Sequence, residues 1–179
     1  MDGNLVWIDL EMTGLNPQED QILEIATLIT DSQLNIIAEG PNLAIFQNEE
    51  TLSKMDEWNQ THHKQSGLLD RVRASTESMR TAEEKTLAFL APYCKPKASP
   101  LCGNSVWQDR RFLDRHMQAL NSFCHYRIID VSSVKELATR WYPKLAPIKK
   151  AESHLALADI KESLEELRYY RQHCFQNPT

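Results

Sequence analysis

The stretch VWIDLEMTG, residues 6–14, places two acidic residues inside an apolar segment. Its composition and alternation are typical of a buried β-strand. Side chains two residues apart in a strand point to the same face, so Asp9 and Glu11 project together while Ile8 and Leu10 take the opposite face. Two ionised carboxylates repel each other, and burying them without a partner is costly. We therefore ask which positively charged partner lies beside these two acids.

A divalent cation is one answer to that question. Carboxylate oxygens suit Mg²⁺ or Mn²⁺, which proteins often hold with a few carboxylates together with a substrate phosphate. The alternative is a solvated strand end, at which Asp9 and Glu11 pair with lysines, because an isolated DxE tripeptide is common. The positions of other acids in the chain distinguish a cation site from a solvated strand end.

The composition is that of a globular protein, since 41% of the 179 residues are hydrophobic and 25% are charged. The length favours a single domain over residues 1–179. No apolar run is long enough to cross a membrane, and no basic leader precedes one, so we expect a cytoplasmic protein without membrane contact. The four cysteines lack metal-ligand spacing and are expected to be reduced thiols.

The formal net charge of −5 argues against a protein that follows long nucleic acids, which usually carries a broad basic surface. A nucleic-acid substrate would therefore be short or bound locally. A local basic patch would escape this argument, because net charge averages over the whole surface.

Three leading strands, followed by strands that alternate with helices, predict an α/β domain with a mixed β-sheet flanked by α-helices. Thr81 is expected to open one helix with a capping box, and Ser132 to cap another. A Gly40-Pro41 pair is expected to interrupt the third strand. The expected strands are residues 5–10, 21–30, 34–46, 100–103 and 126–131, and the expected helices are residues 51–59, 66–73, 81–93, 106–120, 132–141 and 155–173.

Two later segments add acids to the first pair. GNSVWQDRRFL, residues 103–113, places Asp109 in the first turns of a helix that follows a short strand. SHLALADIKES, residues 153–163, places His154 five residues before Asp159 at the start of the last helix. Taken singly, each acid is typical of a helix surface, and the histidine is typical of a cap or surface residue.

Taken together, DLEMTGL, GNSxxxDRRFL and HxALxDIxES resemble the DEDDh superfamily of 3′→5′ exonucleases, and the oligoribonuclease branch most of all. The segments ILEIATLITD, LNIIAEGP, MDEWN, HYRIIDVSSVKELATRWYP and LRYYRQH are similar to that branch as well. The resemblance covers nearly the whole chain and implies an RNase H-like fold. Residues 144–152 do not align one by one, so no role is carried over to them.

The resemblance implies a catalytic set of five residues. Four acids would hold two divalent ions, Mg²⁺ or Mn²⁺, roughly 3.5–4 Å apart across the scissile phosphate. One ion would ready the attacking water, and the other would stabilise the departing 3′ oxygen. His154 would be the general base, since imidazole with a pKa of about 6.5 accepts protons near neutral pH. The implied acids are Asp9, Glu11, Asp109 and Asp159.

The same resemblance implies a substrate site for very short chains. Leu15 would be a wedge between the terminal bases, and Trp58 a stacking platform that contributes on the order of 1–3 kcal/mol. Ser105, Arg127 and Ser132 would cap the terminal 5′ phosphate and leave no exit for a longer chain. Alternatively, Trp58 is a core residue, Leu15 an ordinary turn residue and Ser132 only a helix cap.

Arg127 is harder to explain otherwise, because an arginine among apolar strand residues needs an anionic partner. His63 and Tyr126 match positions that reach the substrate from a partner subunit, so the resemblance also implies a homodimer. A zinc site at His62 and His63 is disfavoured, because no cysteine or acid stands at the usual ligand spacing.

The sequence thus predicts a metal-dependent 3′→5′ exoribonuclease that hydrolyses short single-stranded oligoribonucleotides, dinucleotides included, to nucleoside 5′-monophosphates. A second hypothesis keeps the chemistry but assigns it to proofreading or to trimming tRNA ends. A third is an interaction module that kept the fold and lost the activity, which the presence of all five candidate residues disfavours.

Overall fold

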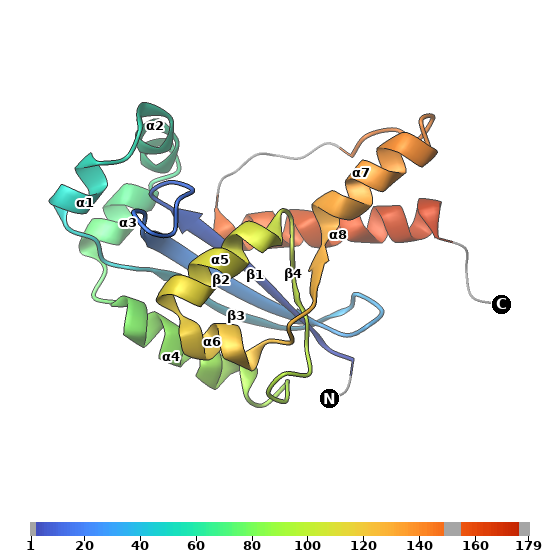
Figure 1. Cartoon of the computed structure of the whole chain (residues 1–179), viewed down its shortest axis with the longest axis horizontal. Helices are drawn as coiled ribbons and strands as arrows, with labels where there is room; N and C mark the ends of the chain where they lie inside the picture. The colour runs from blue at the N-terminus through green and yellow to red at the C-terminus, as the bar shows by residue number, and fades with distance from the viewer. Residues whose placement is uncertain (1–2, 149–154, 176–179) are drawn as a thin grey trace.

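The computed structural model describes residues 3–148 and 155–175, which form one five-stranded sheet with helices around it (Figure 1). The strand order is β3-β2-β1-β4-β5. The strands are β1 (Leu5–Met12), β2 (Ile22–Thr30), β3 (Ile36–Ala44), β4 (Leu101–Gly103) and β5 (Ile128–Asp130). The helices are α1 (Glu49–Ser53), α2 (Glu57–Gln65), α3 (Leu68–Ala74), α4 (Met79–Leu90), α5 (Val106–His116), α6 (Gln118–Phe123), α7 (Val131–Trp141) and α8 (Ala156–Cys174).

The strand β1 lies in the middle of the sheet. It pairs antiparallel with β2, in a register that sets Leu5 opposite Thr30 and Glu11 opposite Glu24. On its other side it pairs parallel with the short strand β4, which in turn pairs parallel with β5. The predicted mixed sheet is confirmed, and so is the opening run of three antiparallel strands.

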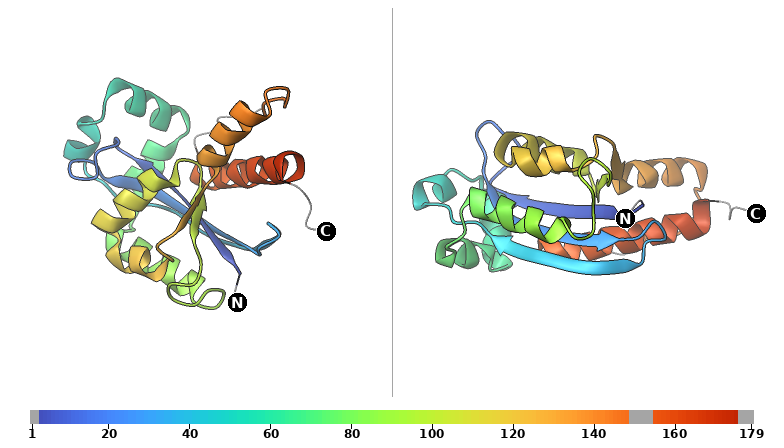
Figure 2. Two further views of the ribbon diagram at one scale, coloured as in Figure 1. Left: turned by 45° about the vertical axis from the view of Figure 1, so that its right-hand side comes forward. Right: turned by 90° about the horizontal axis from the view of Figure 1, so that it is seen from below.

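Helices cover both faces of the sheet (Figure 2). On one face Ile8 and Leu10 of β1 belong to an apolar cluster that includes buried residues of α4, α5 and α6. On the other face Trp7 packs in a cluster with residues of α7 and α8. The alternation of β1 therefore sends Asp9 and Glu11 to the face opposite Ile8 and Leu10, as the sequence predicts, and α8 lies on that face.

Local boundaries differ from the expectations at several helices, and the helix expected over residues 51–59 is divided between α1 and α2. Ser78, not Thr81, is the N-cap of α4, and Thr81 completes its capping box as the third residue of the helix. Asp130 rather than Ser132 caps α7, through its side chain and the Ser132 backbone N–H. The helix expected over residues 106–120 is divided at Met117, whose backbone leaves the helical conformation.

The third strand, β3, runs without a break through Gly40 and Pro41, contrary to the expected interruption. The register with β2 shifts at this point, and β3 is an edge strand, where a proline removes no ladder hydrogen bond. A Cβ at residue 40 would lie 2.5 Å from the ring of Phe89, so a larger residue there would require that ring to shift.

All four cysteines are free thiols, as expected. Among the described helices, none combines the length and the apolar character needed to cross a membrane.

Candidate functional site

Three of the predicted acids meet where β1 passes the first turn of α8. Asp9 and Glu11 extend from β1, and Asp159 extends from the start of α8. Each offers a carboxylate oxygen, and these oxygens all lie within 4.8 Å of one another. Oxygens at this spacing can bind a common divalent cation, for which carboxylates are suitable hard ligands.

Asp109 lies beside this group but is held differently. It is buried in the first turn of α5, and its Oδ1 accepts a hydrogen bond of 2.9 Å from the Leu10 N–H. The Val6 N–H, on the same edge of β1, bonds to Pro100 O, whereas β4 stops at Gly103. The Asp109 carboxylate therefore accepts a hydrogen bond from β1 at a position where β4 has already ended. Asp109 lies outside the group of three close carboxylate oxygens.

The site is electrostatically unfavourable without a cation. Burial raises the pKa of Asp9 well above its usual range, and Asp109, Glu11 and Asp159 raise it further. Burial also raises the pKa of Glu11 to about 8, with additional repulsion from Asp159 and Glu24. The pKa of Asp109 rises to about 7 through burial, although the hydrogen bond from Leu10 opposes the shift. The arrangement fits divalent ions, whose charge would stabilise the ionised carboxylates.

A further acid, Glu24, belongs to this region and was not among the predicted site residues. It lies on β2 directly across from Glu11 and is 0% exposed. Its carboxylate accepts hydrogen bonds from the Arg71 guanidinium and, at 3.4 Å, from the Ala156 N–H. The sequence contains a signal for it, because a glutamate within the apolar run ILEIATLIT is as unusual as the acids of β1.

His63 is buried beside the acids of its own chain, with 3% exposure. Its Nε2 bonds to the Met12 carbonyl at 2.9 Å, and its Nδ1 lies 3.9 Å from Glu11 Oε2. The expectation that His63 reaches the substrate of a partner subunit stays a prediction, and within its own chain this imidazole lies close to Glu11. The predicted general base, His154, lies outside the described residues.

Two apolar side chains near the end of β1 are exposed. Leu15 is 70% exposed in the turn after β1, and Trp58 is 57% exposed on α2. Because Trp58 is exposed, the alternative that it is a core residue is wrong. Its ring stacks on that of His62, with the ring centroids 3.9 Å apart. The Leu15 carbonyl accepts a hydrogen bond of 2.6 Å from Gln108, the neighbour of Asp109 in α5. The sequence gives no sign of Gln108, since its partner lies far away in the chain.

The structure brings together the two serines predicted to cap a phosphate. The hydroxyl groups of Ser105 and Ser132 are 3.1 Å apart, and the Ser105 N–H donates to Ser132 Oγ at 2.9 Å. Ser132 in turn donates to Asn104 Oδ1 at 3.1 Å. This cluster joins the end of β4 to the start of α7.

Arg127 and Tyr126 lie before β5 and are exposed. The premise that Arg127 lies among buried strand residues is wrong, because β5 begins only at Ile128. Its guanidinium lies 5.3 Å from the centroid of the Tyr126 ring, which is 74% exposed. The Arg127 backbone N–H donates to His125 Nδ1 at 3.1 Å.

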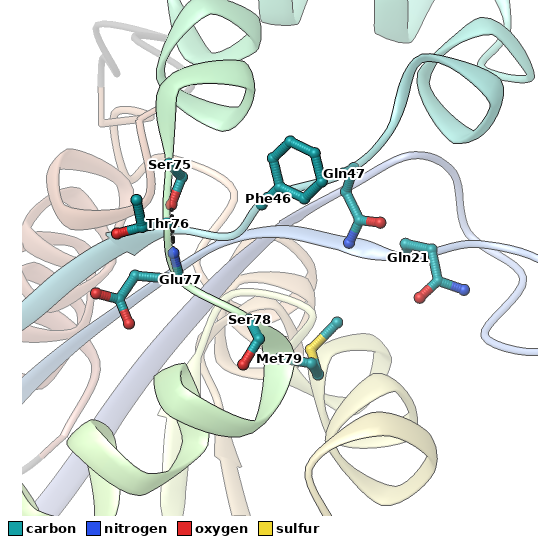
Figure 3. A pocket seen from close by; sticks show the side chains of 8 residues that line it. All are labelled: Gln21, Phe46, Gln47, Ser75, Thr76, Glu77, Ser78 and Met79. Carbon is teal, nitrogen blue, oxygen red and sulfur yellow. Dashed lines mark hydrogen bonds between the residues drawn. The ribbon is translucent and has the colours of Figure 1, made fainter.

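A separate cavity of about 490 Å³ lies between the end of β3 and the turn from α3 to α4 (Figure 3). Gln21, Phe46 and Gln47 line one side of it. On the other side the Glu77 N–H donates to Ser75 Oγ at 3.0 Å. None of the four predicted acids is among its lining residues, so this cavity is distinct from the acidic site.

Comparisons with solved structures identify the fold. A crystal structure of E. coli exonuclease I in complex with an oligonucleotide superposes with a TM-score of 0.69 at 16% identity, over 95% of this chain and 40% of that one. A second such complex gives a TM-score of 0.72 at 15% identity, over 97% and 42%. The chain thus spans about two fifths of the length of exonuclease I. The likeness confirms the predicted RNase H-like fold and shows the fold alone.

Comparisons of sequence identify the family. The RNase T family model, described as an exonuclease, matches residues 6–167. An oligoribonuclease from Pseudomonas syringae pv. tomato is 60% identical over 170 residues, which are 95% of either chain. An oligoribonuclease from Shewanella loihica is 58% identical over 174 residues, 97% of this chain and 96% of the other. With both comparisons in agreement, this chain belongs to the oligoribonuclease family of exonucleases.

Proposed function

We propose that this protein is a metal-dependent 3′→5′ exoribonuclease that hydrolyses short single-stranded oligoribonucleotides, dinucleotides included, to nucleoside 5′-monophosphates. The carboxylate oxygens of Asp9, Glu11 and Asp159, within 4.8 Å of one another in a member of this family, carry the proposal. The whole chain, residues 1–179, would be one exonuclease domain acting in the cytoplasm.

Four acids of the chain would hold two divalent ions, Mg²⁺ or Mn²⁺. Asp9, Glu11 and Asp159 supply the close oxygens, and Asp109 supplies the carboxylate oxygen that Leu10 does not use. When bound, the ions activate the attacking water and neutralise the charge that develops on the phosphate. His154, five residues before Asp159 in the sequence, would accept the proton of that water.

The preference for short chains would follow from the two ends of the substrate site. Leu15 and Trp58 offer exposed apolar surface for the terminal bases, which is unfavourable in water unless a ligand covers it. The joined hydroxyls of Ser105 and Ser132, together with Arg127, would bind the terminal 5′ phosphate and block a longer chain. In a homodimer the exposed Tyr126 would approach this phosphate from the partner subunit.

Hydrolysis of labelled RNAs from two to twenty nucleotides, with Mg²⁺ or Mn²⁺ and with chelator, tests the proposal. We expect the highest kcat/KM for the dinucleotide, 5′-monophosphate products and no turnover with chelator. A twenty-nucleotide RNA cleaved as fast as the dinucleotide would disprove the length preference. Faster cleavage of DNA or of structured tRNA ends would favour proofreading or end trimming instead.

A further inference from the structure

We propose that Glu24, paired with Arg71, is a positioning residue that fixes the first turn of α8 against the sheet and thereby holds Asp159 among the metal-binding acids. This inference rests on the proposed function. It assigns a role to an ion pair whose glutamate is fully buried and which does not itself supply a ligand oxygen to the three-acid group.

The geometry of Glu24 connects three elements. It lies on β2 and faces α8, because its Cα partner in the antiparallel register is Glu11. Its Oε1 accepts from Arg71 of α3, and its Oε2 accepts from the backbone N–H of Ala156, the first residue of α8. Both carboxylate oxygens are thus acceptors. A glutamine would offer only one acceptor oxygen and would lose one of the two contacts.

The start of α8 needs such an acceptor. Its N-cap residue, Leu155, provides no side-chain hydrogen bond, although the first N–H groups of every helix lack partners within the helix. A carboxylate at this end also interacts favourably with the partial positive charge of the helix N-terminus. Asp159 lies in the same first turn, three residues after Ala156, so its direction depends on how this turn is held.

Arg71 makes the buried acid tolerable beside the other carboxylates. A carboxylate that is 0% exposed and unpaired would be strongly destabilising, and the Arg71 guanidinium provides the opposite charge. The two charges also act in opposite directions on their neighbour, since Glu24 raises the pKa of Glu11 and Arg71 lowers it. The pair therefore anchors α8 without adding net negative charge to the site.

The chain offers a matched control in a second ion pair on the same helix. Arg73, two residues after Arg71, pairs with Glu49, but both side chains are exposed. Glu24→Gln and Glu49→Gln therefore remove the same charge from two arginine pairs, one with a buried glutamate and one with an exposed glutamate. Arg71→Met and Arg73→Met form the corresponding pair of arginine variants.

The experiment measures Mn²⁺ binding by calorimetry, amide hydrogen exchange of residues 156–160 in the metal-free protein, and kcat and KM on a labelled dinucleotide. For Glu24→Gln we expect Mn²⁺ affinity about 10- to 100-fold weaker, faster exchange at the start of α8, and a lower kcat with KM changed less than twofold. For Glu49→Gln we expect Mn²⁺ affinity, exchange in this segment and kcat to equal those of the unaltered protein.

Several results would overturn the inference. Unchanged Mn²⁺ affinity and unchanged exchange of residues 156–160 in a folded Glu24→Gln variant would do so while leaving the exonuclease proposal intact. If Glu24→Gln does not fold, Arg71→Met decides, because it must still speed exchange in this segment more than Arg73→Met does. An unaltered protein that binds no Mn²⁺ and cleaves no dinucleotide would overturn the inference together with the function.

Discussion

Asp9, a proposed metal ligand, lies in an environment that is unfavourable to its ionised carboxylate. Burial and the neighbouring acids raise its pKa, so an ionised Asp9 is unfavourable in the metal-free fold. The same crowding makes a divalent cation favourable, since the cation relieves the repulsion among three carboxylates. Stability and activity are therefore expected to respond in opposite directions when such an acid is replaced.

Asp9→Asn should lower kcat/KM on a dinucleotide by about 100-fold or more, because a metal ligand supplies several kcal/mol and about 1.4 kcal/mol is tenfold. The Tm of the metal-free variant should rise, since one source of repulsion is gone. Calorimetric scans with chelator check the second effect. Asp70→Asn, at a highly exposed acid, is the control and should change neither quantity. A lower Tm for Asp9→Asn would contradict this account.

The stability of the metal-free protein should fall as the pH rises from about 4.5 to about 8. Glu11 has a pKa of about 8 in the fold against an ordinary value of 4.5, and Asp109 one of about 7 against 3.8. Between these values the folded chain binds more protons than the unfolded chain, so raising the pH favours unfolding. Each group contributes a slope of at most about 1.4 kcal/mol per pH unit.

Urea unfolding with chelator at pH 5, 6.5 and 8 measures this dependence. Repeating the series with saturating Mn²⁺ should reverse its sign, because the ion binds the ionised carboxylates and its affinity rises with pH. A free energy of unfolding that increases with pH in chelator would show that these acids are not protonated in the fold.

At the scale of elements, α5 connects the metal-binding region with the exposed turn after β1. Asp109 binds the backbone of β1, and the preceding residue, Gln108, binds the carbonyl of Leu15. Gln108→Leu should therefore raise KM for a dinucleotide more than it lowers kcat, because the lost hydrogen bond loosens Leu15. The expected loss of stability is about 1 kcal/mol. Gln118→Leu, at the exposed start of α6, should leave KM unchanged.

The elements also show how far the sequence predicts the structure. The strand β1, the short buried β4 and the last helix follow from apolar patterns, which are local properties of the chain. The cap of α4 was misplaced because Ser78 and Thr81 both stand at sites that fit a capping box. The break between α5 and α6 at Met117 could not be predicted, because no proline or glycine stands there in the sequence.

Some site residues could likewise be predicted from local sequence, whereas others could not. Asp9, Glu11 and Asp159 could be predicted because they stand in recognisable segments, and the structure brings them together. Glu24 and Gln108 were missed because their roles depend on partners 132 and 93 positions away in the chain. Contacts of such separation leave no periodicity in a single sequence, so the folded structure is needed to identify the partners, although the apolar run around Glu24 marks that acid as unusual.

At the scale of the whole molecule, the proposed homodimer makes a prediction about mixtures of variants. Asp9→Asn and Tyr126→Ala homodimers should each be nearly inactive, the first for lack of a ligand and the second for lack of the partner's tyrosine. In a mixed dimer one site has an intact Asp9 and receives an intact Tyr126. Random exchange of subunits should therefore restore about a quarter of the original activity.

Activity assays before and after subunit exchange check this outcome, with light scattering to establish the number of subunits. Mixing Asp9→Asn with Asp159→Asn is the control, because both defects lie in acids of one subunit's own site, so each site of a mixed dimer is defective and the mixture should stay inactive when subunits exchange. A test mixture that stays as inactive as the control after subunits have exchanged would show that Tyr126 acts within its own chain.

The middle position of β1 has a consequence for how the gene can vary. The same eight residues supply the centre of the sheet and two carboxylates, in strict alternation. Inserting or deleting one codon within β1 would move the side chains beyond that point to the opposite face of the sheet. Apolar side chains would then lie at the acidic site, and acidic side chains would lie in the hydrophobic core. We expect natural variants of this segment to differ by substitution only, since a frame-preserving change of length would abolish folding and hydrolysis in one step.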